Sequence, residues 1–379
     1  MKQLLFAITL SVALFGCADK EGAPAGSTAG APMAADLGAG KALAERECKG
    51  CHGLDGRGTA PAIPNLAAQR ESYLLESIAA YKEGRRTHAA LRDMAERMSE
   101  SELHNVIAYY ASLPPVASGS GTNAPVFNPY ENGRVLAENC TKCHGVDGNA
   151  SGAGVPSLAG QQLRYFVVAI QEYLNGVRRT DPMHVLLRRL SKLDEESLAL
   201  YFASQNPASR SAPPFGDPVA GEPLTAVCGG CHGPHGVSTD AATPNLAAQD
   251  ARYLVDAIKA YRKTRRHQSM ETYVGDLRQQ DIENIAAFYS IQKSGPAEKG
   301  QTFVHDLIEK CDRCHGTGVE NASMAIPKIS GQDKDYLIMA LRAYRDDRRQ
   351  SSMMHNMSLP YSDSIIESIS SYYASQPGQ

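Results

Sequence analysis

The sequence predicts an all-α protein built from four consecutive copies of one unit, and three observations support this fold class. The pentapeptide Cys-x-x-Cys-His occurs four times, and several other residue types recur at fixed distances after each copy. Between these positions, apolar residues follow helical spacing. No stretch of the sequence shows the long apolar–polar alternation that is typical of strands.

The four pentapeptides are the most informative feature. With 9 Cys and 11 His in 379 residues, chance alone gives roughly 0.006 copies. The spacing is that of c-type haem attachment, in which two thiols add across the haem vinyl groups and the adjacent imidazole ligates the iron. We therefore expect four covalent haem c groups. The predicted thioether residues are Cys48, Cys51, Cys140, Cys143, Cys228, Cys231, Cys311 and Cys314, and the predicted axial ligands are His52, His144, His232 and His315.

Two other roles of the Cys-x-x-Cys spacing fit this sequence less well. A structural zinc site needs four ligands, usually from a second such pair nearby. Successive pairs here begin 83 to 92 residues apart, with one adjacent histidine each. A thioredoxin-like redox pair would need βαβ surroundings, which the sequence lacks.

The composition excludes one broad class of function. The formal net charge is −3, and no cluster of basic residues stands out, so nucleic acid is not an expected partner. Eight of the nine cysteines fall in the pentapeptides, and the ninth is Cys17.

The N-terminal residues explain Cys17. Lys2 gives a short positive region, and residues 4–15 form an apolar run too short to span a bilayer as a mature helix. The run ends in Leu-Phe-Gly-Cys, which resembles a bacterial lipoprotein signal. The resemblance implies that residues 1–16 are a cleaved signal peptide and that Cys17 is lipidated, which anchors the protein to a membrane in the periplasm. Residues 17–35 are expected to form a flexible tether. An ordinary secretory signal, cleaved further on, is the alternative.

The same series of residues follows each pentapeptide. Counted from the ligand histidine, a proline lies 12 residues on, a glutamine 17, and tyrosines 21 and 29 residues on; an arginine pair and an aromatic pair come later. The prolines are Pro64, Pro156, Pro244 and Pro327, and the glutamines are Gln69, Gln161, Gln249 and Gln332. The tyrosines are Tyr73, Tyr165, Tyr253 and Tyr336, then Tyr81, Tyr173, Tyr261 and Tyr344. The arginine pairs begin at Arg85, Arg178, Arg265 and Arg348, and the aromatic pairs at Tyr109, Tyr201, Phe288 and Tyr372.

Three helices are predicted in each unit. A short one precedes the pentapeptide, as at 40–47 and 132–139, and a longer one follows the glutamine, as at 73–81. A last helix begins at a capping-type residue, as at Ser99 or Asp194. A unit of about 80 residues has a marginal core, so the haem is expected to supply much of it.

Proline-rich breaks separate the four units. They fall at 114–125, 207–214 and 294–296. The first break is the longest and is rich in Gly and Ser, whereas the last is nearly absent. We therefore expect the third and fourth units to abut closely.

Taken together, these residues resemble those of class I cytochrome c domains, and most of all those of the dihaem cytochrome c4 family. The shared features are Cys-x-x-Cys-His-Gly, the Pro-Asn-Leu-Ala-Ala-Gln type of loop, the Arg-Arg turn, a Met and the Tyr-Tyr-Ala-Ser ending. The resemblance implies an all-α chain of four tandem class I cytochrome c domains, each wrapped around one covalent haem c, at 36–114, 125–207, 215–293 and 296–377. Because cytochrome c4 has two domains, this chain is either a doubled cytochrome c4 or a row of four units.

The resemblance also implies Met as the sixth ligand of each iron, which raises the reduction potential and leaves no open position. Met183 and Met270 lie 39 and 38 residues after their ligand histidines and seven before a leucine. The fourth unit offers Met353 and Met354. The upstream arginines favour Met353, whereas the downstream Tyr-Ser start of the last helix favours Met354, which we prefer. Core packing is the alternative role for each of these residues.

The first unit departs from this pattern. The register that gives Met elsewhere falls on Ala90 and Leu91, and leucine cannot ligate iron. Met94 is the preferred candidate, and His88 is an alternative that stands where family members often carry a non-ligating histidine. An open or labile position is the third possibility. We expect the first haem to differ from the other three.

Two recurring features have less specific interpretations. The arginine pairs either bind haem propionates, since Arg binds carboxylates in a bidentate manner, or form solvated helix ends. The tyrosines are expected to be core residues with hydrogen-bonded hydroxyl groups.

Haem c with two protein ligands carries out one-electron transfer. The sequence therefore predicts a membrane-anchored periplasmic tetrahaem carrier. Its expected partners are a quinol-oxidising complex or dehydrogenase as donor and a terminal oxidase or reductase as acceptor. No nucleophile, carboxylate pair or second cofactor motif indicates independent catalysis. Two alternatives are a haem enzyme that reacts at the first haem and a subunit of a larger oxidoreductase.

Overall fold

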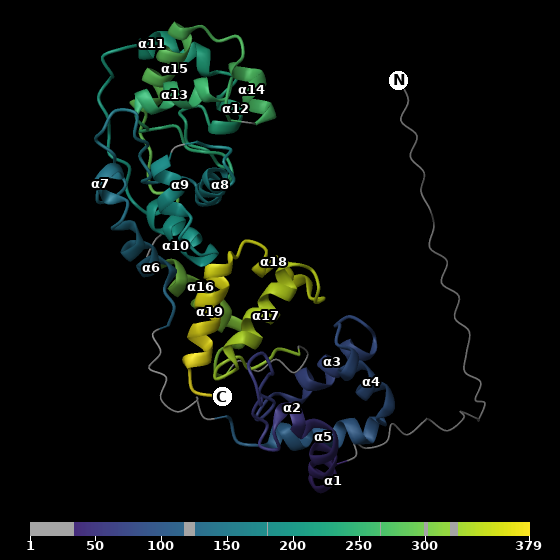
Figure 1. The fold of residues 1–379 in the computed structure, drawn as a ribbon. Coiled ribbons are helices and arrows are strands. Elements are labelled where there is room, and N and C mark those ends of the chain that lie inside the picture. Colours follow the sequence, from purple (N-terminus) through teal and green to yellow (C-terminus); the bar gives the residue numbers. More distant parts are fainter. Residues whose placement is uncertain (1–33, 117–125, 180, 266, 299–301, 319–324) are drawn as a thin grey trace, which may run out of the picture. The chain divides into compact units, whose positions relative to one another are not determined.

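A computed structural model describes residues 34–379 apart from 117–125, 180, 266, 299–301 and 319–324. Residues Asp36–Gln379 form one compact unit. The described residues fold into helices and loops without strands, which confirms the all-α prediction (Figure 1). None of the helices described is long and apolar enough to cross a bilayer. The predicted signal 1–16 and the lipidation residue Cys17 lie outside the described residues.

Four groups of helices follow one another along the chain, and we call them repeats 1 to 4. Repeat 1 contains α1 (Leu37–Leu43), a π-helical turn η1 (Ala44–Cys48), α2 (Lys49–His52), α3 (Glu71–Lys82), α4 (Ala89–Arg97) and α5 (Glu100–Ser112). Repeat 2 contains α6 (Pro129–Ala137), α7 (Thr141–His144), α8 (Leu163–Leu174), α9 (Asp181–Leu187) and α10 (Lys192–Ala203). Repeat 3 contains α11 (Pro218–Gly221), the 3₁₀ turn η2 (Glu222–Thr225), α12 (Gly229–His232), α13 (Ala251–Ala260), α14 (Gln268–Val274) and α15 (Gln279–Ser290). Repeat 4 contains α16 (Thr302–His315), α17 (Lys334–Arg345), α18 (Ser352–Ser358) and α19 (Asp363–Ser375).

Local sequence explains where the last helix of a repeat begins. In α5 the Ser99 side chain and Glu102 form a capping box, in agreement with the prediction for this helix. In α10 the cap is Ser191 rather than Asp194. Asp194 is the third residue of α10, and its carboxylate accepts a hydrogen bond from the Ser191 amide. The helix therefore starts earlier than predicted, because the aspartate is the second half of a capping box.

Within each repeat, the first helix packs against the last. In repeats 1 to 3 a glycine allows this close crossing. A Cβ at Gly133 would lie 2.0 Å from the Ser197 carbonyl oxygen, and a Cβ at Gly40 or Gly221 would lie 2.1 Å from a carbonyl oxygen of the facing helix. The second aromatic of each closing pair anchors the core beneath. These residues, Tyr110, Phe202, Tyr289 and Tyr373, are at most 2% exposed.

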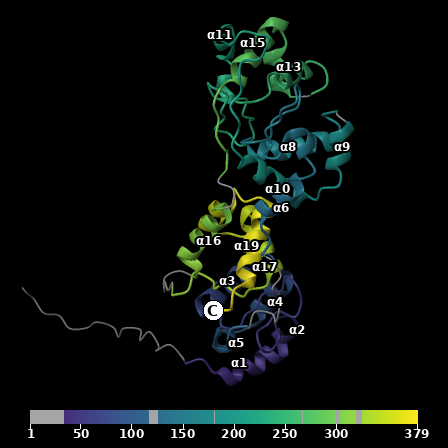
Figure 2. The same cartoon turned by 90° about the vertical axis from the view of Figure 1, so that its left-hand side faces the viewer.

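The repeats associate in an order that differs from their order in the chain. Hydrogen bonds join repeat 2 to repeat 3 and repeat 1 to repeat 4. A further contact links repeats 2 and 4, where α10 packs against α19 (Figures 1 and 2). Leu200 of α10 belongs to the core cluster that is otherwise formed by repeat 4.

Among the residues that the structure describes, the expected close contact between repeats 3 and 4 is not found. In the described chain, the helices of repeat 3 pack extensively only among themselves, and those of repeat 4 also pack against α10. The short connection after repeat 3 instead runs past repeat 2, where the amides of Ala297 and Glu298 both donate to the Ala203 carbonyl oxygen at 2.8 and 3.2 Å. A short linker sets how far two repeats can separate, but not which surface each one finds.

Candidate haem sites

Each pentapeptide places its histidine in the same hydrogen bond. The ring Nδ1 of His52 lies 3.0 Å from the carbonyl oxygen of Pro64. His144, His232 and His315 make the same contact at 2.9 Å with the proline 12 residues on. The carbonyl oxygen of the recurring proline therefore accepts a hydrogen bond from the Nδ1–H group, which leaves the Nε2 lone pair available for iron.

Burial adjusts the protonation of these side chains. It lowers the pKa of each of the four histidines, which favours the neutral imidazole that a metal requires. The first cysteine of each motif is half-buried, and burial raises the pKa of the Cys48 and Cys311 thiols to about 11. The second cysteine is exposed in repeats 1 to 3. In repeats 1 to 3, the thiol of the first cysteine therefore borders the core, and the thiol of the second lies at the edge of the core.

The zinc alternative finds no support in the part of the chain that the structure describes. No group of three or more His, Cys, Asp or Glu side chains could hold a metal ion there. None of the eight described cysteines forms a disulfide. Each Cys-x-x-Cys pair has its own histidine but no second pair nearby.

A fourth, unpredicted helix in each repeat carries the candidate sixth ligand. Met183, Met270 and Met354 are each the third residue of this helix, in α9, α14 and α18. The Met354 amide donates to the Ser351 side chain at 3.3 Å, and the Met270 amide donates to the His267 ring at 3.5 Å. The N-cap therefore sets the register of this residue.

Repeat 1 has the same backbone arrangement with a different residue. Leu91 is the third residue of α4, and its amide donates to the His88 ring at 3.3 Å. His88 caps the helix and lies edge-on to Tyr81, with the ring centroids 6.3 Å apart. His267 makes the corresponding contact with Tyr261 in repeat 3. The role of His88 as a cap is therefore shared with a repeat in which a Met follows.

Repeats 1 and 4 enclose one continuous cavity of about 1440 Å³, including the open space at its mouth. Both first cysteines and both ligand histidines line it, as do Leu91, Met94 and Met354. Met353 is 51% exposed. The structure thus brings together the predicted donors of repeats 1 and 4, and it places Met354 rather than Met353 on the cavity wall.

One arginine of each pair is directed toward the tyrosines. Arg178 lies over the rings of Tyr165 and Tyr173 at 5.5 and 5.7 Å. Arg86, Arg265 and Arg349 hold the corresponding positions in the other repeats. Arg178 and Arg349 are 6% and 8% exposed. The interpretation of these two arginines as solvated helix ends is therefore wrong.

Two of these arginines, Arg86 and Arg349, line the cavity between repeats 1 and 4. The Arg349 guanidinium donates to the Tyr73 hydroxyl at 2.7 Å, but its Nε is buried without a hydrogen-bond partner in the described structure. Burial raises the pKa of Tyr73, and the two arginines lower it by more. Buried guanidinium groups without a carboxylate fit an anion. The residues present therefore fit haem, whose propionates these two arginines would bind.

The recurring glutamines, whose role the sequence did not reveal, join the repeats. Between repeats 2 and 3, Gln161 accepts from the Asn245 amide and donates to its carbonyl oxygen, at 2.8 and 3.0 Å. Gln249 makes the same two bonds to Ser157, at 2.7 and 2.9 Å. Each pair of repeats is thus joined by two glutamines in opposite directions. Gln69 with Lys328 and Gln332 with Asn65 do the same between repeats 1 and 4.

Comparison with known proteins agrees with this geometry. The family model "Cytochrome c" matches residues 37–114 and 130–187, and the model "Cytochrome C oxidase, cbb3-type, subunit III" matches residues 222–288. The helical fold and the four Cys-x-x-Cys-His sites define a c-type cytochrome, which binds haem c covalently and carries electrons. The chain belongs to the class I c-type cytochromes.

Among individual proteins, the chain is similar to cytochrome c4. It is 30% identical to cytochrome c4 of Pseudomonas aeruginosa over 211 residues, which are 53% of this chain and 98% of that protein. It is 28% identical to the thiosulfate dehydrogenase electron acceptor of Thiomonas intermedia over 172 residues, 42% of this chain and 78% of that one. The crystal structure of Pseudomonas stutzeri cytochrome c4 is 28% identical, covers 43% of this chain and 98% of its own, and superposes with a TM-score of 0.39. Each relative corresponds to about half of this chain.

Proposed function

We propose that this protein is a tetrahaem electron carrier with one haem c in each of the cytochrome domains 36–114, 125–207, 215–293 and 296–377. The observation that carries the proposal is the fourfold recurrence of the histidine–proline hydrogen bond behind a Cys-x-x-Cys-His motif. When bound, haem c supplies reversible one-electron exchange. In this proposal His52, His144, His232 and His315 would ligate the haem irons together with Met183, Met270 and Met354. In repeat 1 Met94 is the candidate second donor and His88 the alternative.

The residues of the chain would keep the geometry of each site unchanged between redox states. The proline carbonyl fixes the orientation of the imidazole, and the N-cap fixes the register of the methionine. Buried arginines supply fixed positive charge where the haem carboxylates would lie. The apolar core excludes water. Little reorganisation on electron transfer is what an electron carrier needs.

The proposal includes a place for the protein in the cell. Residues 1–16 would direct export, Cys17 would carry the lipid, and residues 17–35 would tether the helical part to the periplasmic face of a membrane. Donors would be a quinol-oxidising complex or a dehydrogenase, and acceptors a terminal oxidase or reductase. Similarity to proteins named thiosulfate dehydrogenase electron acceptor, from Thiomonas intermedia and Stutzerimonas stutzeri, favours a dehydrogenase as donor.

The direct test is expression of the full chain with a working c-type maturation system. We expect intact mass and pyridine haemochrome absorbance to give about four haems per chain, and spectroelectrochemical titration to resolve their potentials. The Cys140→Ala/Cys143→Ala variant should lose one haem and keep the rest. Colourless protein, or a mass without added macrocycles, would contradict the proposal.

Catalysis at the haem of repeat 1 is a second candidate function. It is favoured by one observation, the presence of Leu91 where the other repeats have methionine. Association with a larger oxidoreductase is compatible with either function.

A further inference from the structure

The cavity between repeats 1 and 4 has two unlike ends. α18 contributes Met354 to its wall, whereas α4 contributes Leu91 and Met94. Leu91 and Met354 are equivalent in register, since each is the third residue of its helix and donates its amide to the N-cap side chain. The leucine side chain offers no lone pair. The place that a thioether occupies in repeat 4 is therefore filled by hydrocarbon in repeat 1.

The chain length of repeat 1 does not make up for the missing methionine. His88 and Ser99, the caps of α4 and α5, are eleven positions apart. The caps in repeat 3, His267 and Arg278, have the same spacing, and so do the caps of α18 and α19 in repeat 4. No insertion or deletion in repeat 1 moves another residue into the place of the missing methionine.

Met94 approaches the cavity from a different position. It lies three residues after Leu91, about 4.5 Å further along the helix axis. The corresponding residues of repeats 2 and 3, Leu186 and Tyr273, are 49% and 52% exposed. Repeats 2 and 3 thus turn this position largely to solvent, whereas its counterpart in repeat 4, Met357, is partly buried and is not among the described residues that line the cavity. A thioether held there is poorly placed to serve as a firm axial ligand, but it can border the cavity.

We infer that repeat 1 provides an exchangeable sixth position, bordered by Leu91 and Met94, that admits a small uncharged diatomic ligand. The inference rests on the proposed function, because it requires haem at His52. The apolar side chains of Leu74 and Ile78 also line this end of the cavity, so an uncharged ligand avoids the cost of desolvating a charge. In repeats 2, 3 and 4 a methionine at the register position fills the corresponding place.

Carbon monoxide binding to the dithionite-reduced, full-length holoprotein tests the inference. We expect about one CO per chain of about four haems, seen as a fractional change of the Soret band. The Leu91→Met variant should abolish CO binding without changing the haem count. Met270→Leu, the matched change in repeat 3, should raise the stoichiometry to about two CO per chain.

The outcomes separate this inference from the proposed function. Four haems with no CO binding, combined with CO binding only after Met94→Leu, would show that Met94 is a firm ligand and overturn the inference alone. Fewer than four haems would count against the tetrahaem proposal instead. The haem count and far-UV circular dichroism of every variant establish whether it has folded. A Leu91→Met protein that folds, holds all its haems and still binds CO would also overturn the inference.

Discussion

The two pairs of repeats are held together by the same kind of interface, but they differ in the charged groups that surround the arginines stacked on their tyrosines. Both pairs use two reciprocal glutamine bridges. Between repeats 2 and 3, Arg178 forms an ion pair with Glu172, whose side chain is 26% exposed. Between repeats 1 and 4, Arg86 and Arg349 have no carboxylate partner among the described residues, and Arg349 Nε is unsatisfied. The same scaffold therefore presents different net charge to the two candidate haem pairs.

The difference is local in sequence. Glu172 lies 28 residues after its ligand histidine, and the corresponding residues of the other repeats are Ala80, Ala260 and Ala343. A single substitution thus adds a negative charge beside one buried arginine. Negative charge near a redox centre favours its oxidised form, so the two pairs are expected to differ in reduction potential although their folds agree.

The two pairs also differ in how the chain connects them. The linker between repeats 2 and 3 carries Arg210, which donates to the carbonyl oxygens of Ala248 and Ala150 at 2.9 and 2.7 Å. It also donates to the Ser157 hydroxyl at 2.7 Å. Repeats 1 and 4 are joined by no direct linker, because the other two repeats lie between them in the chain. Their association therefore depends on the interface itself.

Loss of the glutamine bridges between repeats 1 and 4 should have the largest effect. In Gln69→Ala/Gln332→Ala, the four hydrogen bonds between the repeats disappear, and partly buried backbone groups of Asn65 and Lys328 lose their partners. We expect a cost of about 4 kcal/mol and faster hydrogen exchange of both amides, measured by mass spectrometry.

The matched variant in the other pair is Gln161→Ala/Gln249→Ala. Repeats 2 and 3 should stay associated more readily, because their linker keeps them close and Arg210 bonds across the interface. Equal loss of protection in both pairs would show that the linker contributes little.

Arg210→Ala should weaken the contact between repeats 2 and 3 by about 2 kcal/mol, since four hydrogen bonds from a charged donor are lost, the longest of them to Asp250. The amides of Ser157 and Asn245 should then exchange faster, while those between repeats 1 and 4 should not change. Arg188→Ala, at an exposed arginine of repeat 2, is the control. If Arg210→Ala left the exchange of Ser157 unaltered, the linker arginine would be dispensable.

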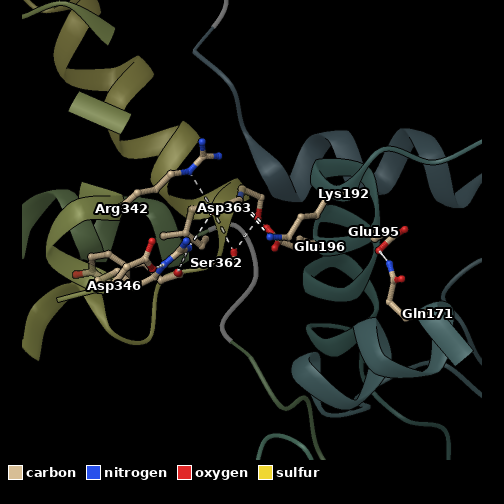
Figure 3. A network of polar contacts seen from close by, with 12 residues as sticks. Gln171, Lys192, Glu195, Glu196, Arg342, Asp346, Ser362 and Asp363 are labelled. Atoms are coloured by element: carbon tan, nitrogen blue, oxygen red, sulfur yellow. Dashed lines mark hydrogen bonds and ion pairs between the residues drawn. The ribbon is translucent and has the colours of Figure 1, made fainter. Parts of the chain in front are cut away.

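The ion pair between Lys192 of repeat 2 and Asp363 of repeat 4 links the two pairs of repeats, and it should weaken in acid (Figure 3). Burial raises the pKa of Asp363, but hydrogen bonds from Lys192 and Arg345 outweigh it and lower the pKa from 3.8 to about 2. A carboxylate with a lowered pKa stabilises the folded state above its ordinary pKa, and this stabilisation is lost as the pH falls from about 4 to about 2.

Because Lys192 is 66% exposed, solvent screening limits the effect of this contact to about 1 kcal/mol. Small-angle scattering over this pH range should show a larger fraction of molecules in which the two pairs have separated. In Asp363→Asn this fraction should already be raised at neutral pH and should change little further in acid. Buried Glu196, which accepts from the Ser364 amide at 2.6 Å, remains a second link in that variant.

The last prediction concerns reduction potential and leaves the fold unchanged. In Glu172→Gln one negative charge beside Arg178 is removed. At roughly 10 Å and an effective dielectric constant of about 20, this is on the order of 1 to 2 kcal/mol, or about 40 to 90 mV upward for one electron. Spectroelectrochemical titration should show one potential moving in the pair of repeats 2 and 3. Ala343→Glu, the reverse change in repeat 4, should lower one potential; no shift in either variant would mean that the charge is screened.

The local features of the sites were predictable from the sequence because they depend on residues close together in the chain. The Cys-x-x-Cys-His motifs and the capping box at Ser99 are of this kind. Met183 and Met270, the candidate sixth ligands of repeats 2 and 3, could be aligned from the sequence because each lies at nearly the same distance from the ligand histidine before it and from the leucine after it. The cap at Ser191 was missed, although the Ser-x-x-Asp pattern that defines it was present in the sequence.

The glutamines had a signal but no assignable role, and the arginine pairs had two alternative roles. Their recurrence at a fixed distance showed that each repeat needs them. The hydrogen bonds by which the glutamines join the repeats, however, reach residues 84 to 267 positions away in the chain, and the Arg349 guanidinium reaches Tyr73, 276 positions away. A pattern that repeats within every unit cannot indicate which other unit it contacts.

The sequence by itself determined the chemistry of each candidate site. The thiols, the imidazole and the proline carbonyl come from residues that are close together in the chain, so their local geometry depends little on the rest of the fold. Only the tertiary structure decided which repeats meet. Asp250 and Asp333 accept from backbone amides of repeats 2 and 1, and Gln162 and Arg70 of those repeats donate in return. Each pair thus combines one carboxylate with one donor. Repeats 3 and 4 both carry the aspartate, so pairing them would bring two carboxylates and no matching donor to one interface, and proximity in the chain does not outweigh that mismatch.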